Sequence, residues 1–205
     1  KYTNNIDPND QVNFKENLNI INNQIKQIEN LVNEFSDFAR MPKPILKKND
    51  LIEILNENIK LLSEIDVKIS INLKTNSKII LFESDKEQLS RVFFNLIKNS
   101  LESIQQKAEK SIDFDKKIFI EIFKDNHHIN ITFIDNGVGF DFFGKDIKNI
   151  LNPYVTTKKN GTGLGLSIAS KIINDHNGII NFKSMDDGAK IEIIFNLDGN
   201  RNINS

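Results

Sequence analysis

The sequence has 205 residues, of which 39% are hydrophobic, and this is enough for one well-packed core with an additional element. A formal net charge of −1, without a long basic run, argues against nucleic acid as a partner. The absence of cysteine excludes disulfides and thiolate metal sites. No apolar stretch approaches the roughly 18 residues that a membrane-spanning helix needs, and no signal peptide is evident. Because the sequence opens with Lys1, we expect a piece of a longer protein without membrane contact of its own.

The first predicted element is a long helix that carries a heptad seam. Apolar residues recur at alternating spacings of four and three, at Phe14, Leu18, Ile21, Ile25, Ile28, Val32 and Phe35. We expect the helix to end before Met41-Pro-Lys-Pro44, because proline lacks an amide proton and restricts the residue before it. The seam favours packing against helices of another chain or of a bundle. The alternative is an ordinary amphipathic helix that lies on its own domain.

The remainder of the sequence alternates helices with strands. Asp50 with Glu53, and Asp85 with Gln88, resemble capping boxes, which mark helix starts. The predicted helices span residues 51 to about 63, 86 to about 108 and 163 to about 176. Strands are expected at residues 67–73, 78–82, 117–124, 129–135, 179–183 and 190–197. This order predicts an α+β fold, a two-layer α/β sandwich with a mixed or antiparallel sheet of about five strands and helices on one face.

Two asparagines mark the longest of these helices. Asn95 and Asn99 are four residues apart, so their side chains share one helix face. An amide oxygen is a neutral, hard ligand of the kind that Mg²⁺ takes together with water and phosphate oxygens. The residues around them are apolar, and polar groups among core residues need a reason to be there. The alternative is chance, because the sequence is rich in asparagine.

Two glycine-containing segments follow. Asp135 ends a predicted strand before Asn136-Gly-Val-Gly139, where a sharp bend lets a flat ligand approach a carboxylate that can accept from adenine N6; a simple Asp-Asn-Gly turn is the alternative. Gly161-Thr-Gly-Leu-Gly165 precedes a helix whose free amides would form an anion site. It is neither a Walker A loop nor a dinucleotide fingerprint. The stretch from Pro153 to Lys158 adds two hydroxyls and a cation for phosphates.

In this order, three segments resemble the N, G1 and G2 boxes of the ATP-binding domain of bacterial sensor histidine kinases, in the gyrase/Hsp90/kinase/MutL superfamily. They are Asn95-Leu-Ile-Lys-Asn99, Asp135-Asn-Gly-Val-Gly139 and Gly161-Thr-Gly-Leu-Gly165-Leu166. The resemblance covers about residues 50–197. It implies a Bergerat-type fold, ATP and Mg²⁺ as cofactors, and protein-histidine kinase activity in a two-component system.

The resemblance also implies roles for individual residues. Asn99 would hold Mg²⁺, Asn95 and Lys98 would line the phosphates, Asp135 would bind adenine, and Lys158 would reach the terminal phosphate. Asn95, Lys98 and Lys158 are therefore the predicted catalytic residues. The other predicted nucleotide-binding residues are Gly137, Gly139, Thr156, Thr157, Gly161, Thr162, Gly163, Leu164, Gly165 and Leu166.

The segment from Val32 to Pro44 is similar to the second dimerisation helix and linker of NtrY-type nitrogen-regulation kinases. The implied organisation is residues 1–44 as part of a dimerisation and phosphotransfer domain, 45–198 as the catalytic ATP-binding domain, and 199–205 as a tail. The implied partners are an NtrX-like response regulator and, in the full-length protein, a second copy. The implied location is the cytoplasmic portion of a protein anchored in the bacterial inner membrane.

The phosphoaccepting histidine of such kinases lies on the first dimerisation helix, upstream of these residues. His127 and His128 fall in a predicted hairpin turn and His176 at a helix end, so none stands at the acceptor position. We therefore expect this chain not to label itself. Two alternatives remain: a non-enzymatic nucleotide-binding dimerisation module, and an ATPase of the same superfamily. The ATPases carry a glutamate base four residues before the metal-binding asparagine, where this sequence has Asn95, an amide that accepts no proton at neutral pH.

Overall fold

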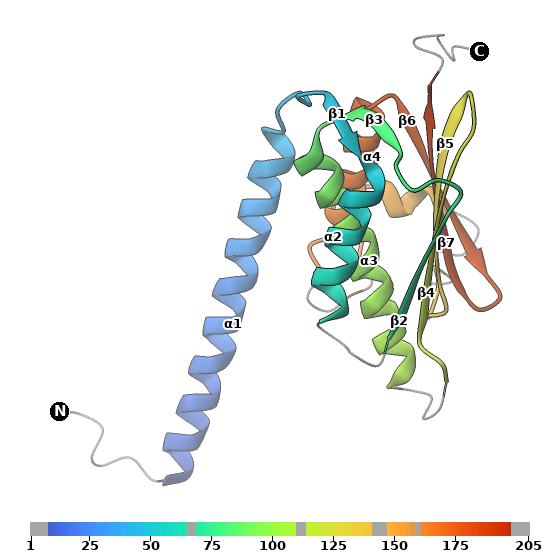
Figure 1. The fold of residues 1–205 in the computed structure, drawn as a ribbon. Helices are drawn as coiled ribbons and strands as arrows, with labels where there is room; N and C mark the ends of the chain where they lie inside the picture. The colour runs from blue at the N-terminus through green and yellow to red at the C-terminus, as the bar shows by residue number, and fades with distance from the viewer. Residues whose placement is uncertain are drawn as a thin grey trace.

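The computed structural model describes residues 8–64, 69–109, 114–140, 147–156, 158 and 161–197. A long helix precedes an α/β unit (Figure 1). The helices are α1 (Pro8–Ala39), α2 (Leu51–Ser63), α3 (Lys86–Ala108), the 3₁₀ helix η2 (Ile147–Leu151) and α4 (Gly165–Asp175). The strands are β1 (Lys47–Asp50), β2 (Ser70–Thr75), β3 (Leu81–Ser84), β4 (Lys117–Lys124), β5 (His128–Asp135), β6 (Gly178–Met185) and β7 (Gly188–Asn196).

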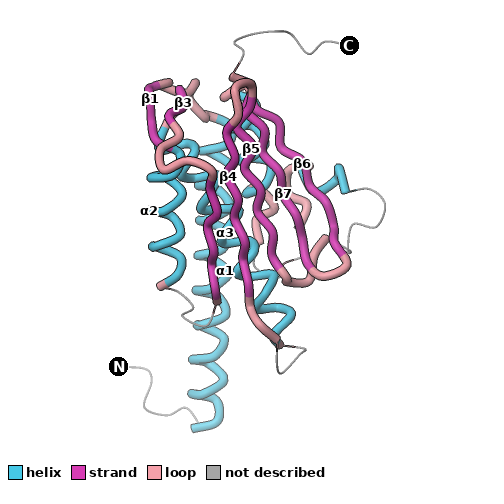
Figure 2. The backbone as a smooth tube through the Cα atoms, turned by 45° about the vertical axis from the view of Figure 1, so that its right-hand side comes forward, coloured by secondary structure: helices cyan, strands magenta, loops and turns pink. Residues whose placement is uncertain are grey.

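Five strands form a mixed sheet in the order β2-β4-β5-β7-β6. β2 runs parallel to β4, and the remaining neighbours are antiparallel. In Figure 2 the strands lie side by side and α2, α3 and α4 stand behind one face, as in the predicted two-layer sandwich. β1 and β3 form a separate antiparallel ribbon.

The core lies between the sheet and these helices. Alternate residues of the three central strands face the helices and are almost fully buried, because side chains of a strand alternate between its two faces. They are Ile118, Ile120, Ile122, Ile129, Ile131, Phe133, Ile191, Ile193 and Phe195. From the other side, α3 contributes the fully buried Leu89, Val92, Phe93, Leu96 and Ile97. This packing fixes α3 firmly against the sheet, with the Asn95–Asn99 segment on the same helix.

Both predicted N-caps are present, but the capping boxes are incomplete. Asp50 Oδ1 accepts from the amide of Ile52 at 3.0 Å, and Asp85 Oδ1 accepts from the amides of Glu87 and Gln88, each at 3.1 Å. The side-chain amide of Gln88 instead donates from Nε2 to the carbonyl of Pro42 at 3.0 Å. The side chain that should have closed the second box therefore ties the linker to α3.

Several element bounds differ from the prediction. β2 and β3 each begin three residues later and end two residues later than expected, and residues 65–68 lie outside the described part. β1 was not predicted, because Lys-Lys-Asn-Asp has no apolar residue and forms a strand only by pairing with β3. α4 begins at Gly165 rather than Gly163, since Gly163 has a φ of +70°, which no right-handed helix accommodates.

The helix α1 projects away from the sheet (Figure 1). The seven seam residues, Phe14, Leu18, Ile21, Ile25, Ile28, Val32 and Phe35, are between 42% and 62% exposed. None of the seven is buried, although Ile28 lines the cavity described below and the ring of Phe35 stacks on that of Tyr154. Across the described residues, no helix is both long and apolar enough to cross a bilayer.

Candidate functional site

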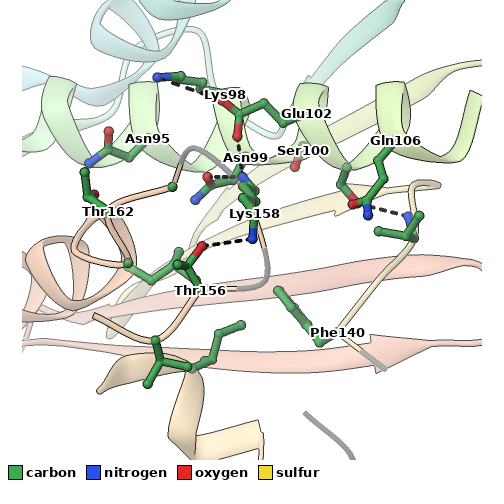
Figure 3. A pocket seen from close by; sticks show the side chains of 18 of the residues that line it. Asn95, Lys98, Asn99, Ser100, Glu102, Gln106, Phe140, Thr156, Lys158 and Thr162 are labelled. Carbon is green, nitrogen blue, oxygen red and sulfur yellow. Dashed lines mark hydrogen bonds and ion pairs between the residues drawn. The ribbon is translucent and has the colours of Figure 1, made fainter. Parts of the chain in front are cut away.

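A cavity of about 970 Å³ opens between α3 and the loops that follow β5 and precede α4. Its walls come from the last residue of β5, the inner face of α3, the start of α4 and the facing side of α1. Figure 3 shows Asn95, Lys98, Asn99 and Glu102 along α3, with Thr156, Lys158 and Thr162 opposite them. Segments far apart in the sequence thus meet around one hollow of the size that small ligands occupy.

One end of the cavity, which we call the Asp135 end, consists of Asp135, Ser100 and Gly137. The Asp135 carboxylate is only 5% exposed. Ser100 Oγ donates to its Oδ2 at 2.9 Å, and the amide of Gly137 donates to its Oδ1 at 3.0 Å. Burial raises the pKa of Asp135, although these two hydrogen bonds act to lower it. The result is a buried acceptor with fixed orientation.

Gly137 stands where the loop after β5 passes closest to α3. A Cβ atom there would lie 2.2 Å from Ser103 Oγ and 2.7 Å from the Ser103 backbone carbon, so no side chain fits. The next amide, that of Val138, donates to Ser103 Oγ at 3.0 Å. The loop is therefore pressed against α3, which brings Asp135 beside the helix face that carries the asparagines.

A second part of the cavity wall, which we call the Asn99 end, consists of Lys98, Asn99, Glu102 and Lys158. Lys158 Nζ donates to Asn99 Oδ1 at 2.8 Å and forms an ion pair with Glu102 Oε2. Lys98 Nζ lies 3.9 Å from Glu102 Oε1, one helical turn away. Figure 3 shows this chain of contacts across the cavity. Two ammonium groups, one carboxylate and one amide are thus linked at this end, which carries an excess of one positive charge.

The loop before α4 closes a third side of the cavity. Leu164, the N-cap residue of α4, makes no side-chain hydrogen bond to the helix amides. The backbone of this loop contacts the backbone at Tyr154, because the amide of Tyr154 donates to the carbonyl of Gly163 at 3.1 Å. Both residues have positive φ, 69° and 70° respectively, and a Cβ at residue 163 would lie 2.5 Å from the Tyr154 carbonyl carbon. An uncapped helix start beside this loop is suited to an anion.

The C-terminal part of α1 touches the same loop. Thr162 Oγ1 donates to a carboxylate oxygen of Glu34. The ring of Phe35 stacks on that of Tyr154, with centroids 6.4 Å apart. Glu34 also lines the cavity. The projecting helix therefore contacts the domain at the rim of the site.

Most of the residues predicted from sequence lie together around this cavity. Those that line it are Asn95, Lys98, Asn99, Asp135, Gly139, Thr156, Lys158, Gly161, Thr162, Gly163, Gly165 and Leu166. Gly137 lies directly behind Asp135, and Leu164 is fully buried in the core. Thr157 falls outside the described residues.

Three residues at the site were missed by sequence reasoning. Ser100 donates a hydrogen bond that orients Asp135, and Ser103 accepts one from the amide of Val138 in the turn after β5. Glu102 forms ion pairs with both lysines of the Asn99 end. Helical spacing held a signal for two of them, because Glu102 is four residues after Lys98 and Ser103 is four residues after Asn99. Nothing in the sequence indicated the partner of Ser100, which is 35 residues away.

None of the three histidines lines the cavity. His176 is buried, with Nδ1 2.8 Å from the carbonyl of Ile172 and Nε2 accepting from the amide of Asp85 at 3.0 Å. These contacts fix a neutral tautomer that donates from Nδ1. His127 lies in the β4–β5 turn, as predicted, whereas His128 is the first residue of β5, where it pairs with Asn196 of β7.

Comparison with known proteins gives consistent results. Residues 84–199 match the family described as histidine kinase-, DNA gyrase B- and HSP90-like ATPase. An NtrY-like sensor histidine kinase of Rickettsia bellii is 33% identical over 188 residues, which are 90% of this chain and 29% of the relative. The nitrogen regulation protein NtrY of Azorhizobium caulinodans is 30% identical over 175 residues, or 80% of this chain and 21% of the relative. The chain spans less than a third of the length of these relatives.

Solved structures share the fold. The catalytic domain of the histidine kinase ThkA matches with a TM-score of 0.63 at 24% identity, over 74% of this chain and 95% of that one. The histidine kinase ThkA in its complex with the response regulator TrrA matches with a TM-score of 0.71 at 23% identity, over 95% of this chain and 53% of that one. The family match covers more than half of the sequence and includes α3, the Asp135 turn and the loop before α4. This chain therefore belongs to the histidine kinase-, DNA gyrase B- and HSP90-like ATPase family and carries its ATP-binding domain.

Proposed function

We propose that this chain is the ATP-binding kinase portion of an NtrY-like sensor histidine kinase. In this proposal it transfers the γ-phosphoryl group of ATP to a histidine that is not one of its own three. Residues 45–198 form the catalytic domain, residues 1–44 belong to a dimerisation and phosphotransfer domain with its linker, and residues 199–205 are a tail. The similarity to NtrY-like kinases over 90% of the chain supports this assignment.

The cavity fits ATP as substrate. Its volume of about 970 Å³ lies in the range of small-molecule sites. Asp135 offers a buried, ionisable acceptor to the exocyclic amine of adenine, and the start of α4 with Thr156, Lys158 and Thr162 offers donors to the phosphates. In this proposal the purine lies at the Asp135 end, which offers a hydrogen-bond acceptor, and the phosphates lie at the Asn99 end, which offers ammonium groups.

The Asn99 end fits Mg²⁺. Asn99 Oδ1 already accepts from a cation, the Lys158 ammonium, at 2.8 Å, so this oxygen lies where a positive charge is favourable. We assign Asn99 as the residue that holds the metal, and Asn95 and Lys98 as residues that line the phosphates. When bound, Mg²⁺ neutralises phosphate charge, which is the main requirement of phosphoryl transfer.

The observation that favours a kinase over an ATPase is the amide of Asn95. It stands on the cavity wall, one turn before Asn99, where the superfamily's ATPases have a glutamate base. The carboxylate that shares Lys158 with Asn99, that of Glu102, is engaged with two ammonium groups. Transfer to a histidine needs no base from this side, because the acceptor nitrogen carries its own lone pair.

The acceptor and the downstream partner lie outside this chain in the proposal. His176 cannot act as the acceptor, because both of its ring nitrogens are engaged in the interior. The response regulator of the complex formed by ThkA supports an analogous partner, which we propose to be NtrX-like. We place the chain on the cytoplasmic side of a membrane-anchored protein that forms dimers, for which the exposed seam of α1 is suited.

A phosphotransfer assay tests the proposal. The chain is mixed with γ-labelled ATP, Mg²⁺ and the histidine-bearing dimerisation domain of an NtrY-like relative, and label is followed in both proteins. We expect acid-labile label on the supplied domain and none on this chain. The matched control replaces the acceptor histidine of the supplied domain by glutamine, which should remove the signal.

Two results would contradict the proposal. Release of inorganic phosphate at the same rate with and without the acceptor domain would indicate an ATPase. Tight binding of ATP with no transfer to the supplied domain, and none to any other NtrY-like acceptor domain, would leave a nucleotide-binding dimerisation module as the better description.

A further inference from the structure

The oxygen that we assign to Mg²⁺ already carries a cation of the protein itself. Lys158 Nζ lies 2.8 Å from Asn99 Oδ1, and the same ammonium is ion-paired with Glu102 Oε2. A metal ion and an ammonium on one amide oxygen would repel each other strongly. Lys158 must therefore leave Asn99 before a metal ion can take its place.

Glu102 is the residue that keeps Lys158 there. Its two carboxylate oxygens face two different lysines: Oε2 faces Lys158, and Oε1 faces Lys98 at 3.9 Å. If Lys158 departs, Glu102 still has Lys98 as a partner on its own helix. The departure of Lys158 thus leaves no unpaired carboxylate at the phosphate side of the cavity.

We propose that Glu102 is a positioning residue that holds Lys158 on Asn99 until a nucleotide with Mg²⁺ enters. This inference rests on the proposed function, because it takes Asn99 as the metal ligand and Lys158 as a phosphate contact. In the absence of metal the ammonium takes the position on Asn99 Oδ1 that the metal ion would take. It is then released to the terminal phosphate, while Glu102 remains paired with Lys98.

The expected effect is modest because the pair is partly in water. The side chains of Lys158 and Glu102 are 36% and 37% exposed, so solvent screens their attraction. Ion pairs of this kind change an equilibrium constant by up to about fivefold, and usually by less. We expect loss of the Glu102 charge to tighten the binding of Mg²⁺–nucleotide by about three- to fivefold.

The test is a double-mutant cycle on the full chain, with the non-hydrolysable analogue AMP-PNP as the probe. Dissociation constants are measured by calorimetry for the parent, Glu102→Gln, Lys158→Met and the double variant, each in Mg²⁺ and in EDTA. Glu57→Gln is the matched control, because it breaks an exposed ion pair of α2 with Lys86, 2.9 Å long and remote from the cavity. Unfolding midpoints of all variants establish that each is folded.

Tighter AMP-PNP binding in Glu102→Gln could have two causes, which the cycle distinguishes. If Glu102 holds Lys158, Glu102→Gln tightens AMP-PNP binding in the parent but not in the Lys158→Met background, and the gain is larger in Mg²⁺ than in EDTA. If Glu102 merely repels phosphates, the gain is equal in both backgrounds and larger in EDTA, where phosphate charge is unscreened by metal. Glu57→Gln should change neither constant.

The second pattern, or no tightening in Glu102→Gln, would overturn the inference while leaving the proposed function intact. A parent chain that binds no AMP-PNP in either buffer would overturn the proposed function and the inference together. These two failures are distinguished by the parent titration alone, before any variant is compared.

Discussion

At one end of the cavity a single carboxylate is buried and held by two fixed donors, whereas at the other end four partly exposed polar groups hold one another. Asp135 accepts hydrogen bonds from the Ser100 hydroxyl and the Gly137 amide, and the packing of α3 against the sheet fixes the positions of both donors. Asn99 instead accepts from a lysine on a loop, which also pairs with Glu102. The first end is organised before a ligand arrives, and the second must rearrange to admit one. Under the proposed function, the Asp135 end would select the base of the nucleotide, and the Asn99 end would change its contacts when the metal and phosphates bind.

Removing the proposed metal ligand, Asn99, should give the largest effect. In Asn99→Ala we expect phosphotransfer to fall by on the order of 100-fold or more, because metal neutralisation of phosphate charge is worth several kcal/mol. The affinity for AMP-PNP should also lose its dependence on Mg²⁺, which calorimetry in Mg²⁺ and EDTA measures. Unchanged transfer and an unchanged Mg²⁺ dependence would show that the Asn99 end is not the metal side of the cavity.

Asp135→Asn tests the specificity of the Asp135 end. An amide accepts less well from an exocyclic amine than a carboxylate does, so we expect AMP-PNP affinity to fall by about 1–3 kcal/mol, or roughly 5- to 150-fold. Tripolyphosphate, which has no adenine, serves as the matched ligand and should bind both proteins equally. Equal loss for the two ligands would mean that Asp135 does not read the base.

Ser100→Ala sharpens the claim that this end is organised in advance. The loss of one donor to a charged acceptor should weaken AMP-PNP binding by about 1 kcal/mol, or roughly fivefold, and should raise the pKa of Asp135 further. Ser63→Ala is the control, because Ser63, the last residue of α2, donates to the carbonyl of Lys60 at the exposed end of that helix. If Ser100→Ala binds like the control, the orientation of Asp135 does not depend on that donor.

The smallest effect is a shift in pH dependence. Burial raises the pKa of Asp135, so its carboxylate becomes protonated at a higher pH than an ordinary aspartate does. Binding of Mg²⁺–ADP should therefore begin to weaken above the usual aspartate range as the pH falls, and Asp135→Asn should lack this acid limb.

The same shift has the opposite sign for folding. The folded state binds the proton of Asp135 more tightly than the unfolded state, so the cost of the buried charge is present at neutral pH and is relieved as the pH falls through the raised pKa. Urea unfolding of the parent and of Asp135→Asn across that pH range should show that the contribution of Asp135 to the free energy of unfolding becomes more favourable as the pH falls. If the binding of Mg²⁺–ADP weakened equally at acid pH in the parent and in Asp135→Asn, protonation of Asp135 would not be the cause.

Sequence alone predicted the sandwich and the gathering of most of the site, because hydrophobic periodicity and the glycine segments are local signals. The bounds of α2, α3 and β4 were predicted to within a residue, since N-cap aspartates and alternating isoleucines mark them. β1 could not be predicted, because its sequence is polar and only pairing with β3 makes it a strand. Glu102 and Ser100 were missed for a related reason: their roles depend on partners that the fold brings from elsewhere in the chain.

The apolar seam of α1 shows another limit of such patterns. It has the same helical periodicity as the buried face of α3, yet its residues are exposed while those of α3 are buried. Periodicity therefore predicts that a face is apolar, but not which surface covers it. That question depends on tertiary and quaternary contacts that no local pattern encodes.

The contact between Tyr154 and Gly163 has a consequence for how this family member can diverge. The shape of the cavity mouth there is set by one backbone pressed against another, with a main-chain hydrogen bond between them. Neighbouring side chains can be exchanged through mutation without altering that shape, provided that residue 163 stays glycine. The loop can thus change the charges and hydroxyls that it offers to a ligand while the opening itself is inherited unchanged.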